Sequence, residues 1–280
     1  MKIVESTHEA YAHVNHWRME GQSVGLIPTM GALHEGHYSL VRQSVTDCDL
    51  TVATIFVNPT QFGPDEDLER YPRTLEADLA GLRELGTDLV FVPTKETLYP
   101  PGFSTYVDEP DAAAPLEGEF RPGHFRGVMT IVMKLFQILP ATIAYFGQKD
   151  FQQVTVIRRM VEDLNVPIRV VGCPTVREQD GLAMSSRNRY LTQEQRKRAL
   201  CLNRALSAVS RLLDDGERQV AKLENAMREV LDGETDSIDY ARVVDSMHLQ
   251  SLETVDRPAV ALIAAQVGTT RLIDNLMLER

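Results

Sequence analysis

Two histidines lie three residues apart in a glycine-containing segment near the N-terminus. Residues 28–37 read PTMGALHEGH and contain His34 and His37. The segment follows an apolar, β-branched run and opens a helical pattern, and a helix start presents unpaired N–H groups and the positive end of the helix dipole. Glycine permits a tight turn and close backbone approach. This spacing predicts that both imidazoles face one phosphate-sized ligand and donate hydrogen bonds to its oxygens.

Two other interpretations of His34 and His37 need weighing. A zinc site of the His-Glu-x-x-His type needs its histidines at positions i and i+4 in the middle of a helix. Here the spacing is three and Gly36 intervenes, which argues against zinc. The second alternative is a helix cap with two incidental histidines. That alternative leaves unexplained why two glycines and two histidines meet at the end of a strand.

Two more polar segments combine residue types that bind phosphate. In residues 147–150 (GQKD), a glycine and Lys149 precede a helical pattern, which suits phosphate but also occurs in surface turns. Residues 184–188 (MSSRN) offer two serine hydroxyls and the guanidinium of Arg187, which could clamp triphosphate oxygens. Taken alone, such a run is also typical of a solvated linker.

An amide and a basic cluster suggest a site for a second, anionic substrate. Gln61 follows an apolar strand and a turn at Pro59, and its amide offers a donor and acceptors to hydroxyls and carboxylates. An ordinary loop amide is the alternative. Arg121, His124 and Arg126 concentrate positive charge within six residues, which fits either an anionic pocket or a solvated face.

Alternating strands and helices must position these residues. Apolar, β-branched runs occur at residues 23–27, 51–57, 89–92, 143–146 and 169–173. Helical periodicity fills the gaps between the runs, and this alternation predicts a mostly parallel sheet with helices on both faces. We expect a Rossmann-like domain over residues 1–175. Ligands of such sheets bind at the carboxyl ends of the strands, where the histidine segment lies.

The pattern changes after residue 175. A long charged helix is predicted over residues 192–213 and a second over 219–231, and apolar runs at 240–244 and 260–266 read as strands. We expect residues 176–280 to form a smaller α+β domain that covers the site.

Composition excludes several classes of protein. The chain has 280 residues, and 29 Lys and Arg against 40 Asp and Glu give a net charge of −11, which argues against a general nucleic-acid binder. The longest apolar run, residues 259–265, is too short to span a bilayer, and the N-terminus lacks the apolar segment of a signal peptide. Three scattered cysteines, without metal spacing, argue against a disulfide framework and favour a reducing cytoplasm.

Several of these segments resemble one known family. The HxGH tetrad at residues 34–37 resembles the signature of the HxGH nucleotidylyltransferase superfamily, and the fuller run 28–37 resembles the pantothenate synthetase (pantoate–β-alanine ligase) family. Further segments resemble that family in the same order: residues 55–62 (IFVNPTQF), 71–73 (YPR), 121–128 (RPGHFRGV), 146–153 (FGQKDFQQ), 184–188 (MSSRN) and 270–275 (TRLIDN). The resemblance covers nearly the whole chain. Phe120 stands where a small residue is expected, and position 148 is Gln where Glu also occurs in the family.

The resemblance implies an enzyme that condenses (R)-pantoate with β-alanine to pantothenate. ATP would activate the acid as pantoyl adenylate, with release of pyrophosphate and then AMP. The family assigns His37 as proton donor, and His34, Lys149 and Arg187 would share the catalytic work. Mg²⁺ would bridge phosphate oxygens, and Asp78 and Asp150 are both candidates as its protein ligand. A homodimer is also implied.

The expected binding residues fall into two groups. Residues expected to bind ATP are Met30, Gly31, His34, His37, Gly147, Gln148, Lys149, Asp150, Val176, Met184, Ser185, Ser186 and Arg187. Gln61 and Gln153 are expected to hold pantoate and β-alanine. A different HxGH nucleotidylyltransferase is one alternative, although amides rather than cations would then face the acceptor. A nucleotide-binding regulator without catalysis is another, although none of the phosphate contacts is missing.

Overall fold

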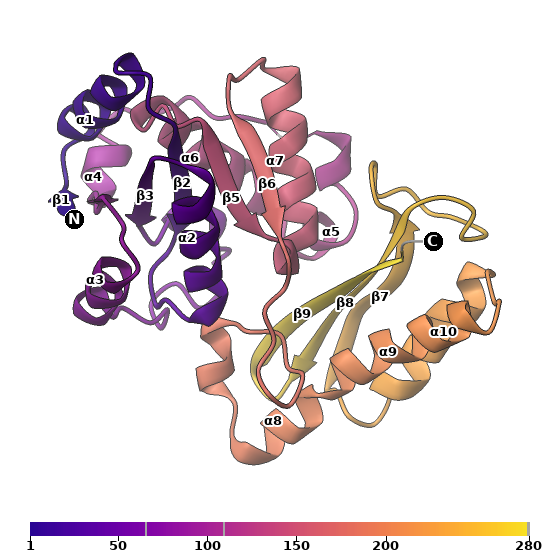
Figure 1. The fold of residues 1–280 in the computed structure, drawn as a ribbon. Coiled ribbons are helices and arrows are strands. Elements are labelled where there is room, and N and C mark those ends of the chain that lie inside the picture. The colour runs from indigo at the N-terminus through magenta and orange to yellow at the C-terminus, as the bar shows by residue number, and fades with distance from the viewer. Residues whose placement is uncertain (65, 109, 279–280) are drawn as a thin grey trace. The chain divides into compact units, whose positions relative to one another are not determined.

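The computed structural model describes residues 1–64, 66–108 and 110–278. The chain divides into two compact units. One comprises Met1–Gln148 and Val156–Pro174, and the other comprises Lys149–Thr155 and Thr175–Arg280. Each unit has its own sheet, as Figure 1 shows.

The first unit is built on a six-stranded parallel sheet with the strand order β1-β4-β3-β2-β5-β6. The strands are β1 (Lys2–Val4), β2 (Val24–Thr29), β3 (Leu50–Ile55), β4 (Leu89–Phe91), β5 (Ile143–Gly147) and β6 (Arg169–Cys173). Leu26 and Ile27 are neighbours on β2 and are both fully buried. Because consecutive side chains of a strand point to opposite faces, both faces of the sheet must be covered.

Helices cover this sheet and connect its strands. They are α1 (Thr7–Met19), α2 (Glu35–Asp47), α3 (Leu75–Glu84), α4 (Lys95–Leu98), α5 (Glu117–Phe120), α6 (His124–Ile138) and α7 (Phe151–Asp163), with 3₁₀ turns η1 (Pro59–Gln61), η2 (Asp111–Ala113) and η3 (Gln148–Asp150). On one face, Leu40 and Val41 of α2 and Leu82 of α3 join a buried cluster with Ile27 and Tyr145 of the sheet. The predicted Rossmann-like parallel sheet is confirmed.

The strand order reverses between β2 and β5, which are hydrogen-bonded neighbours. Ligands of open parallel sheets bind at such a switch point, beyond the carboxyl ends of the strands. Here β2 leads into Met30 and Gly31, and β5 ends at Gly147 and leads into Gln148. The topology therefore brings four of the residues expected to bind ATP to the carboxyl ends of two neighbouring strands.

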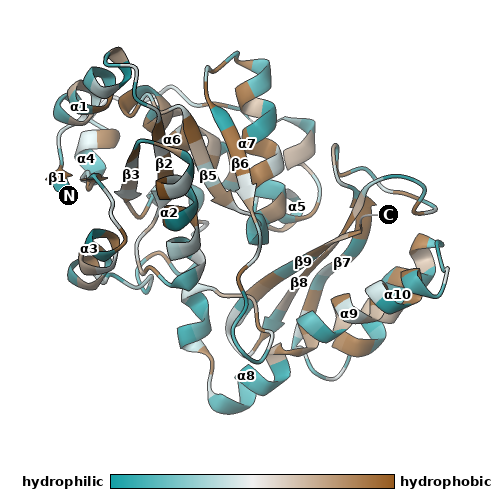
Figure 2. Ribbon diagram, viewed as in Figure 1, coloured by the Kyte–Doolittle hydropathy of each residue, from teal (hydrophilic) through white to brown (hydrophobic). Residues whose placement is uncertain are grey.

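In its described residues after Pro174, the second unit contains a three-stranded antiparallel sheet and three α-helices. The elements are η4 (Ser186–Tyr190), α8 (Gln193–Ala199), α9 (Cys201–Asp214), α10 (Val220–Leu231), β7 (Ser237–Asp245), β8 (Ala259–Val267) and β9 (Thr270–Leu278). The middle strand β8 is buried along almost its whole length. Figure 2 shows hydrophobic residues along the strands and hydrophilic residues over α8. The prediction of a smaller α+β unit is confirmed.

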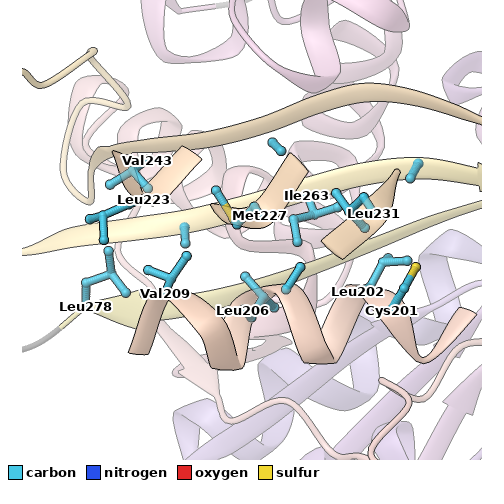
Figure 3. Packing of buried hydrophobic residues seen from close by; sticks show 14 of the residues in the cluster. Cys201, Leu202, Leu206, Val209, Leu223, Met227, Leu231, Val243, Ile263 and Leu278 are labelled. Atoms are coloured by element: carbon cyan, nitrogen blue, oxygen red, sulfur yellow. The ribbon is translucent and has the colours of Figure 1, made fainter. Parts of the chain in front are cut away.

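Apolar side chains of α9 and α10 form the core of the second unit on this sheet. Figure 3 shows Leu202, Leu206 and Val209 of α9 beside Met227 of α10 and Ile263 of β8. These positions on α9 repeat every three or four residues, which produces one apolar face.

Three details differ from the sequence prediction. The predicted helix over residues 192–213 is two helices, because at Leu200 the ψ angle of −14° interrupts the helical hydrogen-bond ladder. No glycine or proline marks this break. Strands β1 and β9 were not predicted, since β1 has three residues and β9 mixes apolar with charged and amide residues without a regular alternation. No helix in the described part of the chain is long and apolar enough to cross a membrane.

Candidate active site

One buried carboxylate holds the loop between β2 and α2. Asp78 of α3 is 2% exposed and accepts hydrogen bonds from the N–H of Ala32 at 2.9 Å and of Leu33 at 2.9 Å. Thr74 Oγ1 donates a third bond to it at 3.0 Å. A Cβ at Gly31, where φ is +80°, would lie 3.1 Å from the Asp78 carboxylate. The carboxylate oxygens of Asp78, a candidate ligand for Mg²⁺, therefore accept hydrogen bonds that shape this loop.

The two histidines cap helix α2 through their Nδ1 atoms. The helix begins at Glu35, so His34 is the N-cap and His37 the third helical residue. His34 Nδ1 accepts the Gly36 N–H at 3.2 Å, and His37 Nδ1 accepts the His34 N–H at 3.4 Å. An accepting nitrogen carries no proton, so the neutral rings are protonated at Nε2.

The His34 and His37 rings lie against each other, with centroids 4.2 Å apart. Both are half-buried at the N-terminus of α2. Two Nε2–H donors and the positive end of a helix dipole therefore occur together, which is an arrangement suited to phosphate oxygens.

A buried asparagine orients the amide of Gln61. Asn58 is 1% exposed, and its Nδ2 donates to Gln61 Oε1 at 2.9 Å and to the carbonyl of Gly127 at 3.2 Å. Its Oδ1 accepts from Thr60 Oγ1 at 2.9 Å and from Tyr99 Oη at 2.8 Å. Because Gln61 Oε1 accepts from Asn58, the N–H groups of the Gln61 amide point away from Asn58.

Those N–H groups face the loop after β2. Gln61 Nε2 lies 3.3 Å from Met30 Sδ. The structure thus brings a residue expected to bind pantoate next to one expected to bind ATP. A primary amide presented by its N–H groups is suited to carboxylate and hydroxyl oxygens.

Arg126 of the predicted basic cluster is exposed, whereas Arg121 and His124 have a different role from either of the two expected. Arg121 pairs with Glu66 through two bonds, from Nε at 2.8 Å and from Nη2 at 2.7 Å, and lies 3.4 Å from Glu117. Its Nη1 lies 3.0 Å from Nε2 of His124, whose Nδ1 lies 2.8 Å from the carbonyl oxygen of Gln61. Arg121 donates to Nε2, so Nδ1 carries the proton and donates to Gln61.

Burial and the charge of Arg121 keep His124 neutral. His124 is 8% exposed, and desolvation followed by the nearby guanidinium lowers its pKa to about 4. A neutral ring at neutral pH keeps the tautomer that holds the Gln61 carbonyl. Arg121 and His124 thus support the main chain of Gln61 instead of lining a pocket for an anionic substrate.

The segment that follows β5 carries the predicted cation. Lys149 and Asp150 lie in η3, and their side chains are 18% and 48% exposed, with Nζ 3.9 Å from Asp150 Oδ1. Gln153 is half-buried in the first turn of α7, and Gln152 beside it is buried. Lys149–Thr155 belong to the second unit, whereas Gln61 belongs to the first. The joint role of Gln61 and Gln153 stays a prediction.

The serine–arginine segment is not an irregular loop. Ser185 caps η4, its Oγ accepting the Arg187 N–H at 3.3 Å, and Ser186 is 6% exposed. The N–H of Met184 donates to the carbonyl of Val176 at 3.0 Å, which closes the hairpin leading into η4. The structure therefore brings five of the predicted ATP residues together within the second unit.

The comparisons with known proteins agree with this geometry. The family model described as pantoate-beta-alanine ligase matches residues 2–277. The chain belongs to the pantoate–β-alanine ligase family. A pantothenate synthetase of Geobacter sulfurreducens is 50% identical over 279 residues, covering 99% of each chain, and one of a Roseiflexus species is 57% identical over 258 residues, covering 92% of this chain and 93% of the relative.

Solved structures of this ligase family share the fold. A pantothenate synthetase of Thermus thermophilus matches with a TM-score of 0.93 at 46% identity, covering 99% of each chain. A pantoate–β-alanine ligase of Francisella tularensis, complexed with β-γ ATP and β-alanine, matches with a TM-score of 0.80 at 33% identity, covering 99% of this chain and 97% of that one. The predicted family and ligase class are confirmed.

Sequence reasoning missed the supporting roles of three residues, although it named two of them, Asp78 and His124, for other roles. Asn58, Asp78 and His124 are all buried and all bond to a segment that carries a predicted site residue. A usable signal was present, because NPTQF and RPGHFRGV are both polar, glycine- or proline-bearing segments next to strand and helix ends.

Proposed function

We propose that the chain joins (R)-pantoate to β-alanine in two half-reactions. In the first, a pantoate carboxylate oxygen attacks the α-phosphorus of ATP, and the bond to the bridging oxygen breaks to release pyrophosphate and leave pantoyl adenylate. In the second, the β-alanine amine attacks the acyl carbon, AMP leaves with the electrons of the acyl–oxygen bond, and the nitrogen loses a proton. No protein nucleophile is needed, so positioning and electrostatic stabilisation supply the rate.

The pair of Nε2–H donors at the start of α2 carries this proposal. His34 and His37 contact phosphate oxygens, and His37 supplies the proton-donating group. Lys149 and Arg187 neutralise charge on the β- and γ-phosphates. The remaining ATP contacts are Met30, Gly31, Gly147, Gln148, Asp150, Val176, Met184, Ser185 and Ser186.

Gln61 and Gln153 hold the organic substrates. The N–H groups of Gln61, turned away from Asn58, donate to pantoate oxygens. The Francisella tularensis relative is complexed with β-γ ATP and β-alanine, and we extend both ligands to this chain.

Mg²⁺ accompanies the nucleotide in this proposal. When bound, it would offset negative charge on the phosphates. Within the described residues, no group of three or more His, Cys, Asp or Glu could hold a metal, which fits a cation that arrives with ATP. Asp150 is the better protein candidate, because the Asp78 oxygens hold the loop after β2. A homodimer follows from the resemblance, and the three free cysteines fit a cytoplasmic location.

One assay tests the whole proposal. The protein is mixed with ATP, Mg²⁺, pantoate and β-alanine, with each organic substrate omitted in turn, and AMP and pyrophosphate are followed. We expect AMP only with both organic substrates, and isotope exchange between pyrophosphate and ATP with pantoate alone. A product that retains the nucleotide would instead indicate another nucleotidylyltransferase. ATP binding without any turnover would indicate a regulator.

A further inference from the structure

Three polar side chains of β9 are buried although β9 lies at the edge of its sheet. Thr270, Asp274 and Asn275 are 2%, 3% and 6% exposed. They belong to the TRLIDN segment, to which the reaction above gives no role. Burying such groups is unfavourable unless they are hydrogen-bonded, so their partners show what the segment does.

Asp274 fixes the hairpin that leads into the serine–arginine segment. It accepts two bonds from Arg177, at 2.7 Å on Oδ2 and 2.9 Å on Oδ1, and Arg177 also donates to the carbonyl of Gly181 at 3.1 Å. An isolated antiparallel β-bridge pairs Arg177 with Ala183, two residues before Ser185. A two-bond guanidinium–carboxylate pair is strong and directional, so the hairpin is anchored to β9.

Asn275 reaches the main chain of the predicted phosphate-binding lysine. Its Nδ2 donates to the carbonyl oxygen of Lys149 at 2.8 Å. Residues Lys149–Thr155 belong to the second unit, although the residues on either side of this segment belong to the first. The bond therefore attaches a short excursion of the chain to the strand that also anchors the 177–183 hairpin.

We propose that Asn275 is a positioning residue for Lys149. By holding the Lys149 carbonyl, it sets the Cα position from which the ammonium group reaches the β- and γ-phosphates. Lys149 and the segment 185–187 then share one reference, strand β9, and keep their spacing to each other. This inference rests on the proposed function, which assigns Lys149 to the phosphates.

Comparing ATP with AMP tests the inference, because AMP lacks the phosphates that Lys149 contacts. Both affinities are measured by calorimetry for Asn275→Leu, which is similar in size but cannot donate. We expect the ATP affinity to fall about 3- to 10-fold, the worth of one hydrogen bond, and the AMP affinity to stay unchanged. Amide formation from preformed pantoyl adenylate should also be retained. Asn275→Ser, too short to reach the carbonyl, should behave in the same way if the leucine variant folds poorly.

A double-mutant cycle shows whether Asn275 acts through Lys149. In a Lys149→Ala background, Asn275→Leu should no longer change the ratio of ATP to AMP affinity. Arg271→Gln is the matched control, since it removes a 2.7 Å bond to Asp239 from the same strand and should leave the ratio unchanged. Equal losses for ATP and AMP, a persistent effect in the Lys149→Ala background, or the same shift in the control would each overturn the inference. Absence of AMP formation by the unaltered protein would instead overturn the proposed function, and the affinity ratio would still report on Asn275.

Discussion

Backbone N–H groups determine which ring nitrogen of His34 and of His37 carries the proton. Because each Nδ1 accepts such a bond, each neutral ring presents Nε2–H. We expect His37→Ala to lower kcat by about 10²–10³, the usual loss for one transition-state donor. His37→Asn should be as slow while keeping the cap, because its Oδ1 can replace Nδ1. Steady-state kinetics and thermal melting check both, with His16→Ala on the surface of α1 as control. An unchanged kcat in His37→Asn would remove the Nε2 proton from the mechanism.

Another residue-scale prediction concerns His124 and pH. Its pKa is lowered to about 4 in the fold, from 6.5, by burial and by Arg121. Between these values the unfolded chain binds a proton that the folded chain does not. The free energy of unfolding is therefore highest above pH 6.5 as far as His124 is concerned. It falls as the pH decreases towards 4, by about 3 kcal/mol in total.

Urea unfolding at neutral pH and at a pH just above the folded-state pKa measures this effect. The free energy of unfolding should fall less between the two pH values in His124→Asn than in the unaltered protein. The asparagine keeps a donor for the Gln61 carbonyl but does not titrate. Equal falls in the two proteins would show that His124 is not held neutral.

At the scale of elements, helix α6 and turn η1 interlock. The carbonyl of Gly127 accepts from Asn58, and a Cβ at Gly127 would overlap the carbonyl group of Thr60. Backbone atoms cannot move aside as a flexible side chain can, so Gly127→Ala should push the turn and displace Gln61. We expect the KM for pantoate to rise about tenfold, the cost of roughly one misplaced hydrogen bond, with little change in the KM for ATP. Kinetics with each substrate varied in turn measure this, and an equal rise in both KM values would indicate a general defect.

At the scale of the whole molecule, each unit has its own apolar core. Leu206 is 1% exposed in the core of the second unit (Figure 3), and removing it should cost about 2–5 kcal/mol. Hydrogen exchange of β8 should speed up in Leu206→Ala, whereas the fluorescence transition of Trp17, the single tryptophan, should move less because Trp17 lies on α1 of the first unit. Ile27→Ala in the first core is the reciprocal control. Equal shifts at both probes would show that the units unfold together.

The sequence alone determined the alternation of elements, the ligase family and the segments that carry chemistry. Periodicity is local, so the helix predicted over residues 219–231 lies within one residue of α10, and the strand–glycine–histidine succession at residues 28–37 marked the segment predicted to bind phosphate. Local patterns failed where local signals are weak, at the break between α8 and α9 and at the strand β9 with its mixed residue types.

Only the tertiary structure decided how the site residues are held. Asp78 supports a loop 46 residues before it, His124 holds a carbonyl 63 residues before it, and Asn275 holds one 126 residues before it. Each of these side chains is polar and buried, and its role depends on a partner that folding brings within hydrogen-bonding distance. Spacing along the chain predicts which residues share a helix face or a strand end. It does not predict hydrogen bonds between distant segments, because these depend on how the sheets and helices pack.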